Sequence, residues 1–152
     1  MSILPAAQGG RQSPLLEHLR PWLGRLPARP DADAVAGLAA QAGLVTASGH
    51  PLRFVPPRDD VLGYERRIWE RGEVETRPDN WHDFFNALIW LAFPQAKAAL
   101  NARHVREMGA GAAPRGQARD AMTHFDECGL VVVSSNPLLL DLLRGFRWKE
   151  LF

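Results

Sequence analysis

The stretch from Asn80 to Phe93, NWHDFFNALIWLAF, decides the fold. At about 100° per residue, its apolar side chains fall on one broad face of a helix that a core can cover. The predicted core-facing residues are Trp81, Phe84, Phe85, Leu88, Leu91 and Ala92. Asn80 is a favoured N-cap residue, because its side chain accepts a hydrogen bond from a free amide of the first turn. We therefore predict an amphipathic helix that begins after Asn80 and stops before Pro94.

The opposite face of this helix carries His82, Asp83 and Asn86. A solvated face would carry Lys, Glu or Arg instead, and here Trp90 and Phe93 lie among the small polar groups. Large aromatic side chains are seldom left on a free surface, so we expect this face to be at least partly covered. It is then either a hydrogen-bonded polar core or a binding pocket. A further interpretation of Asp83 is a charge that the positive end of the helix dipole favours.

The segments on either side predict an α+β protein that is mostly helical, with a small antiparallel hairpin or sheet. Helices are expected at residues 15–26 (opened or kinked by Pro21), 31–43, 61–71, 94–108 and 136–146, and a short strand at 52–55. The hairpin is expected from 119–125 and 130–134, joined by a DECG turn, with the run of valines at 131–133 as a buried strand. Residues 1–13 are predicted to be a flexible N-terminus, 109–117 a flexible loop, and 14–152 a single globular domain.

Composition excludes several classes of protein. The formal net charge is +1, from 18 basic and 17 acidic residues, which argues against a nucleic-acid binder that neutralises many phosphates. The arginines near 103–119 leave that only as a weaker option. One cysteine allows no intrachain disulfide, and no signal peptide or membrane span is evident. We therefore expect a cytoplasmic protein without a membrane or nucleic-acid partner.

Two further sets of residues can carry chemistry. Lys97, Asn101 and His104 are spaced at i, i+4 and i+7 and share one stripe of the helix that follows Pro94. His104 is either a ligand that faces this stripe or an exposed imidazole at a helix end. Around the predicted hairpin, Arg119, Asp120, Thr123, Asp126 and Glu127 cluster, although Asp126 and Glu127 also suit a turn.

The first functional hypothesis is a metal-dependent hydrolase acting on a phosphoester. His82-Asp83 is a short pair of the kind found in HD-type phosphohydrolases. The predicted catalytic residues are His82, Asp83, Asn86 and Arg119, and the predicted metal ligands are His82, His104, Asp120 and Asp126. Imidazole and carboxylate donors suit Zn, Mn or Mg, and Arg119 would stabilise developing negative charge.

The second hypothesis is a non-catalytic protein-interaction or ligand-binding module. Here the polar stripe is a buried hydrogen-bond network, and Trp69, Trp90 and Trp148 help to form a surface for a protein partner. The chain ends in RWKELF, where Trp148 and Phe152 need an apolar surface to cover them. A satisfied network together with an exposed apolar patch would favour this hypothesis over the hydrolase.

The chain also resembles a known family through long and specific motifs. They are YERRIWERGEVETRPDNWHDFFNALIWLAFPQAKAALNARHVRE, then RGQARDAMTHFDECGLVVVSS, and finally WKELF, which together run from Tyr64 to the end. The resemblance is to the uncharacterised bacterial family labelled domain of unknown function 3025. It implies no activity, cofactor or partner. Members of the family often continue past WKELF into a segment with another histidine. If that segment contributes to a site, the resemblance implies that the site in this chain is incomplete.

Overall fold

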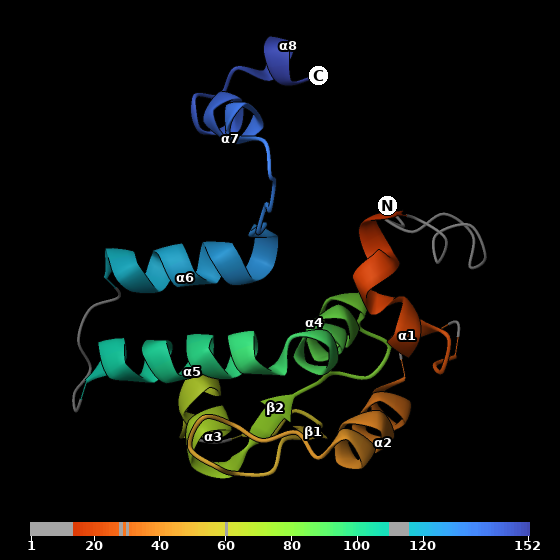
Figure 1. Cartoon of the computed structure of the whole chain (residues 1–152). Helices are drawn as coiled ribbons and strands as arrows, with labels where there is room; N and C mark the ends of the chain where they lie inside the picture. Colours follow the sequence, from red (N-terminus) through yellow and green to blue (C-terminus); the bar gives the residue numbers. More distant parts are fainter. Residues whose placement is uncertain (1–13, 28, 30, 60, 110–115) are drawn as a thin grey trace. The chain divides into compact units, whose positions relative to one another are not determined.

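The computed structural model describes residues 14–27, 29, 31–59, 61–109 and 116–152 (Figure 1). The predicted flexible N-terminus at 1–13 and most of the predicted loop at 109–117 lie outside these residues. The chain divides into two compact units, Met1–Gly116 and Gln117–Phe152. We call them the first and the second unit and describe each by itself. The predicted single domain from 14 to 152 stays a prediction.

The helices of the first unit begin and end where local sequence signals place them. They are η2 (Pro14–Leu19), α1 (Arg20–Leu23), α2 (Ala32–Ala42), α3 (Tyr64–Arg71), α4 (Trp81–Ala92) and α5 (Pro94–Met108). Asp31 caps α2 by accepting a hydrogen bond from the Ala34 amide, and Gly43 ends it in the left-handed conformation. The proline expected at the start of a helix near 21 lies in the first turn of α1. The helices predicted at 31–43 and 94–108 are confirmed, whereas the helix predicted at 15–26 is divided into η2 and α1 and the one predicted at 61–71 begins at Tyr64.

The sheet of the first unit is parallel, not antiparallel as predicted. β1 (Arg53–Val55) pairs with β2 (Glu73–Glu75), with Phe54 opposite Val74. The predicted strand at 52–55 is confirmed, but its partner lies beyond α3 (Figure 1). A helical crossover between two strands permits parallel pairing, whereas an antiparallel hairpin needs a tight turn.

Gly72 makes the turn from α3 into β2 possible. Its φ is +69°, and a Cβ at this position would lie 2.2 Å from the carbonyl oxygen of Pro51. Its carbonyl accepts a hydrogen bond from the Arg53 amide, which starts the pairing of the two strands. Only glycine combines this left-handed conformation with so close an approach of two backbones.

The core of the first unit forms around α4. Its largest fully buried side chains are Trp90, Leu19, Ile68, Leu88, Val35 and Val74. α4 buries Phe84 and Leu88 on the predicted core face and also Asp83 and Trp90 on the opposite face, so the predicted cover over that face is confirmed. Trp81 is an exception, because it is 42% exposed and lies outside the core where we had placed it.

The second unit is helical throughout its regular structure, and the predicted hairpin is wrong. It contains α6 (Gln117–Cys128), α7 (Pro137–Arg144) and α8 (Trp148–Leu151). The first predicted strand lies in α6, in which Ala118, Met122 and Phe125 repeat at helical spacing and Arg119 and Ala121 are good helix formers. The valines at 131–133 form no strand and are exposed. None of the helices that the structure describes is long and apolar enough to cross a membrane.

Candidate functional site

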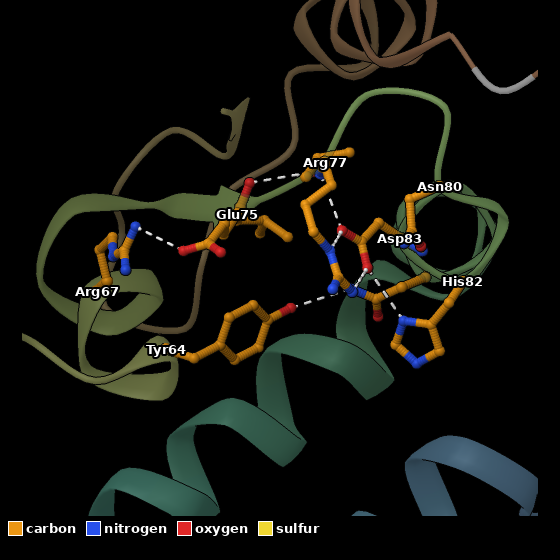
Figure 2. Close-up of polar contacts among 10 residues, drawn as sticks. Tyr64, Arg67, Glu75, Arg77, Asn80, His82 and Asp83 are labelled. Carbon is orange, nitrogen blue, oxygen red and sulfur yellow. Dashed lines mark hydrogen bonds and ion pairs between the residues drawn. The ribbon is translucent and has the colours of Figure 1, made fainter. Parts of the chain in front are cut away.

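A carboxylate at the start of α4 organises the polar face of that helix (Figure 2). Asn80 caps the helix by accepting a hydrogen bond from the Asp83 amide at 3.0 Å. Arg77 donates to Asp83 from its backbone amide, from Nε and from Nη2, each at 2.8 Å. His82 adds a contact of 3.1 Å between Nδ1 and Asp83 Oδ1. Both oxygens of the nearly buried Asp83 carboxylate are therefore occupied by protein donors.

These contacts fix the charge state of Asp83. The side-chain hydrogen bonds from Arg77 hold the pKa of Asp83 well below its ordinary value, with smaller contributions from the Arg77 amide and His82. Burial opposes this shift but does not cancel it. The same pairing raises the pKa of Arg77. Asp83 is thus a permanently charged anchor at neutral pH, with no lone pair directed at a ligand.

His82 lies on the solvent side of this anchor. Its side chain is 71% exposed, and Nδ1 faces the Asp83 carboxylate. A carboxylate at Nδ1 favours the tautomer that leaves Nε2 as the acceptor, the arrangement that orients many metal-binding and proton-accepting imidazoles. His82 is therefore oriented, but it projects from the surface and not into a covered pocket.

A second chain of hydrogen bonds joins α4 to α5 and α3. Lys97 donates from Nζ to Asn86 Oδ1 at 2.8 Å, and Asn86 donates from Nδ2 to the Tyr64 hydroxyl at 3.0 Å. The Lys97 ammonium also lies 5.7 Å from the centre of the Trp90 ring, within the range of a cation–π contact. Lys97 and Trp90 are both buried. This part of the polar stripe therefore links α3, α4 and α5.

The predicted stripe on α5 is buried along its length. Asn101 donates from Nδ2 to the backbone oxygen of Glu65 at 2.9 Å and to its Oε2 at 2.7 Å. His104 is buried as well, so its interpretation as an exposed imidazole at a helix end is wrong. Its Nδ1 and the Asn101 Oδ1 have no hydrogen-bond partner among the residues that the structure describes, which is unusual for buried polar atoms.

Most partners in these networks were absent from the sequence prediction. Arg77 lies in the TRPDN turn, six residues before Asp83, and Tyr64 and Glu65 open α3. Another buried cation, Arg67, pairs with Glu75 at 3.1 Å across α3 and β2. An Arg followed at short range by a helix-start Asp is a signal that could have indicated Arg77. The residues on α3 carry no such local signal.

The remaining predicted residues, Arg119, Asp120 and Asp126, belong to α6 of the second unit. Because this segment is helical, Arg119, Thr123 and Asp126 share one stripe at i, i+4 and i+7. The Thr123 hydroxyl donates to the Arg119 carbonyl at 3.0 Å. The strand geometry expected for Asp120 and its neighbours is therefore wrong, while their predicted roles stay predictions.

A pocket among the described residues of the first unit lies away from the predicted site. Its volume is about 290 Å³, and it is lined by the start of α2 and by the segments around β1 and β2, with Asp31, Asp33 and Asp79 among the lining residues. Neither His82 nor Asn86 lines it. Across the described residues, no three or more His, Cys, Asp or Glu side chains are grouped closely enough to hold a metal ion.

The second unit exposes large apolar side chains instead. Phe146, Trp148 and Phe152, which we call the aromatic cluster, contact one another, with ring centres 5.9 and 6.5 Å apart along the series. These residues are nevertheless 73%, 48% and 98% exposed, respectively. The leucine at 130 and the valines at 131–133 are exposed as well. Few apolar side chains of the second unit are buried: Leu142 is buried, whereas most of the others are partly or largely exposed.

Backbone geometry presents the first ring of this cluster. After α7, the Phe146 amide donates to Leu143 and the Arg147 amide to Leu142, which is the hydrogen-bond pattern of a Schellman motif. The left-handed position in that motif belongs to Phe146, with φ +53°, and Gly145 precedes it. Glycine normally occupies this position, and a bulky side chain there is strained. Phe146 in this strained conformation presents an aromatic ring on the surface, whereas a glycine would present no side chain.

Comparison with known protein families gives a match over most of the chain. The family model described as protein of unknown function (DUF3025) matches residues 52–152, well over half of the chain, and confirms the resemblance noted from the motifs after Tyr64. No curated protein and no solved structure matches the chain.

Proposed function

This chain belongs to the family described as protein of unknown function (DUF3025), and we propose that it acts as a protein-interaction module. In this proposal the second unit supplies the contact surface, and the polar networks of the first unit stabilise the fold. The aromatic cluster carries the proposal. Three large rings that contact one another yet remain exposed to solvent are unfavourable in free energy and are typical of sites that another protein covers.

The polar stripe of the first unit supports the same assignment. Asp83 accepts hydrogen bonds at both oxygens, and Asn86 is bonded on both sides, to Lys97 and to Tyr64. A catalytic carboxylate needs an open coordination or proton-accepting position, whereas a stabilising network has its members paired. The pairing observed here is of the second kind. Its residues connect α4 to α3, to α5 and to the segment before Asn80.

A matched pair of surface substitutions tests the proposal. Phe152 in the aromatic cluster is 98% exposed and Val61 in the first unit is 101% exposed, so Lys at either position should leave the fold intact. The full chain and the variants Phe152→Lys and Val61→Lys would each be immobilised and compared for the proteins they retain from an extract of the native host. We expect at least one protein that the full chain and Val61→Lys retain and Phe152→Lys loses. Identical retention by the three would reject the second unit as an interaction surface.

A metal-dependent hydrolase is our second candidate, because one observation favours it. The Asp83 carboxylate orients His82 with Nε2 toward solvent, as in many metal-binding histidines. In this candidate His82 is the ligand, and Asp83 acts by positioning it. The test is the melting temperature of the chain with added Mn²⁺ or Zn²⁺. A rise that His82→Ala abolishes supports the candidate, and no rise with either ion dismisses it.

A further inference from the structure

The aromatic cluster also indicates which partner the second unit takes. Resting on the interaction function proposed above, we propose that the partner is a second copy of this chain, and that two aromatic clusters pack against each other in a symmetric dimer. Three observations carry this inference: the area of the exposed rings, the charges beside them and the strained backbone of Phe146.

The exposed area is sufficient for a dimer. A fully covered aromatic side chain buries roughly 150–250 Å², so the exposed parts of the three rings amount to about 450 Å² per copy. Leu138 and Leu139 on the adjoining helix α7 are also exposed. Two copies that covered these surfaces would bury roughly 1,200 Å² in total, which reaches the lower end of the range for specific stable interfaces.

The charges beside the cluster are compatible with self-association. Arg147 pairs with Glu150, with Nε donating to Oε1 at 2.8 Å, and Arg144 pairs with Asp141 at 3.4 Å. Arg144 and Arg147 are therefore each paired within their own chain, and Lys149 leaves residues 137–152 with a formal net charge of +1. A symmetric interface places identical surfaces opposite each other, so a face of one dominant charge would repel its copy. A face with one net charge repels its copy only weakly, because exposed charges are screened by solvent and salt.

The strained backbone of Phe146 indicates that its ring has a function in binding. A left-handed conformation at a bulky residue costs about 1 kcal/mol or more, and glycine would adopt it without strain. The hydrogen bonds of the Schellman motif hold the conformation and direct the ring toward Trp148, at 5.9 Å. Such strain is commonly retained where a side chain takes part in binding. We therefore assign Phe146 as an anchor of the dimer contact.

Glycine at this position separates folding from association. Phe146→Gly relieves the strain and removes the ring, so it should weaken the dimer by at least about tenfold without lowering the melting temperature measured at a concentration where both chains are monomeric. Asp79→Gly is the control, because Asp79 is the other described non-glycine residue with positive φ and lies in the first unit. It should leave association unchanged.

The measurement is sedimentation velocity on the full chain and both variants across 1–200 µM. The proposal expects a concentration-dependent dimer for the full chain and Asp79→Gly and a monomer for Phe146→Gly. If Phe146→Gly loses its circular dichroism signal, Phe152→Ala replaces it, since that terminal ring contacts Trp148 and is almost fully exposed. A monomeric full chain, or a dimer that survives loss of either ring, overturns the proposal. Loss of a retained protein in Phe152→Lys, together with a monomeric full chain, would support an interaction function with a different partner.

Discussion

Arg77 donates three hydrogen bonds to the carboxylate of Asp83, two from its guanidinium and one from its backbone amide. The segment that leaves β2 is thereby joined to the first turn of α4, where the carboxylate also faces the positive end of the helix dipole. The guanidinium is about half exposed and the carboxylate nearly buried. The interaction therefore combines a desolvated acceptor with donors held partly by the backbone, a geometry in which ionised hydrogen bonds are strong.

Stability should fall in acid because of this pair. The pKa of Asp83 is depressed in the folded chain, so its contribution is fully present above the ordinary carboxyl pKa of about 3.9. It is lost progressively as the pH falls below that value. At pH 7 we expect Asp83→Asn to lower the free energy of unfolding by about 2 kcal/mol. Urea unfolding at pH 7, 5, 4 and 3 would show this difference shrinking in acid. Asp33→Asn, at an exposed site on α2, should change little, and a constant difference across the pH range would contradict the assignment.

The cap of α4 should depend on a side-chain oxygen at position 80. Asn80 Oδ1 accepts from the Asp83 amide, and Asn80→Ala removes this acceptor at a cost of about 1 kcal/mol. Asn80→Ser restores a side-chain oxygen and should recover most of the loss. Thermal unfolding of the three chains checks the order. Equal melting temperatures for the Ala and Ser variants would mean that the cap does not stabilise the helix.

Local chemistry was the part of the fold that could be predicted from the sequence. The caps at Asp31, Asn80 and Asn136 depend on residues within three positions of each other, so their signals survive without knowledge of the fold. The pairing of Phe54 with Val74 does not. It joins residues twenty positions apart through an intervening helix, and a three-residue strand has too short a pattern to indicate its partner.

The candidate site divides in the same way. The positions His82, Asp83 and Asn86 were identified from helical spacing alone, because small polar groups beside aromatics are unusual on a helix. Their partners Arg77 and Lys97 depend on the path of the chain and on helix packing, which spacing does not describe. The valines at 131–133 misled the prediction because a β-branched run favours a strand only where a neighbouring strand can pair with it.

The turn at Gly72 should be intolerant of a side chain. A Cβ there would lie 2.2 Å from the Pro51 oxygen in a conformation with φ +69°, so Gly72→Ala should destabilise the first unit by about 2 kcal/mol or more. Gly37 is the matched control, because it lies within α2 with nothing within 4 Å of an added Cβ. Gly37→Ala should stabilise by up to about 1 kcal/mol. Opposite signs in chemical denaturation would confirm the geometry, whereas two stabilising changes would refute the close approach at Gly72.

The helix that replaced the predicted hairpin gives the last prediction. Ala121 lies within α6 and Val132 in the irregular segment after it. Proline removes a helical hydrogen bond and clashes with the preceding turn, at a cost of about 3 kcal/mol. Ala121→Pro should therefore reduce the helical circular dichroism signal and the amide protection of residues 121–128. Val132→Pro should leave both unchanged, because no backbone hydrogen bond of a helix or strand is assigned to it. In a hairpin both prolines would interrupt a strand. An equal loss of circular dichroism signal and amide protection in the two variants would therefore support the hairpin and exclude α6.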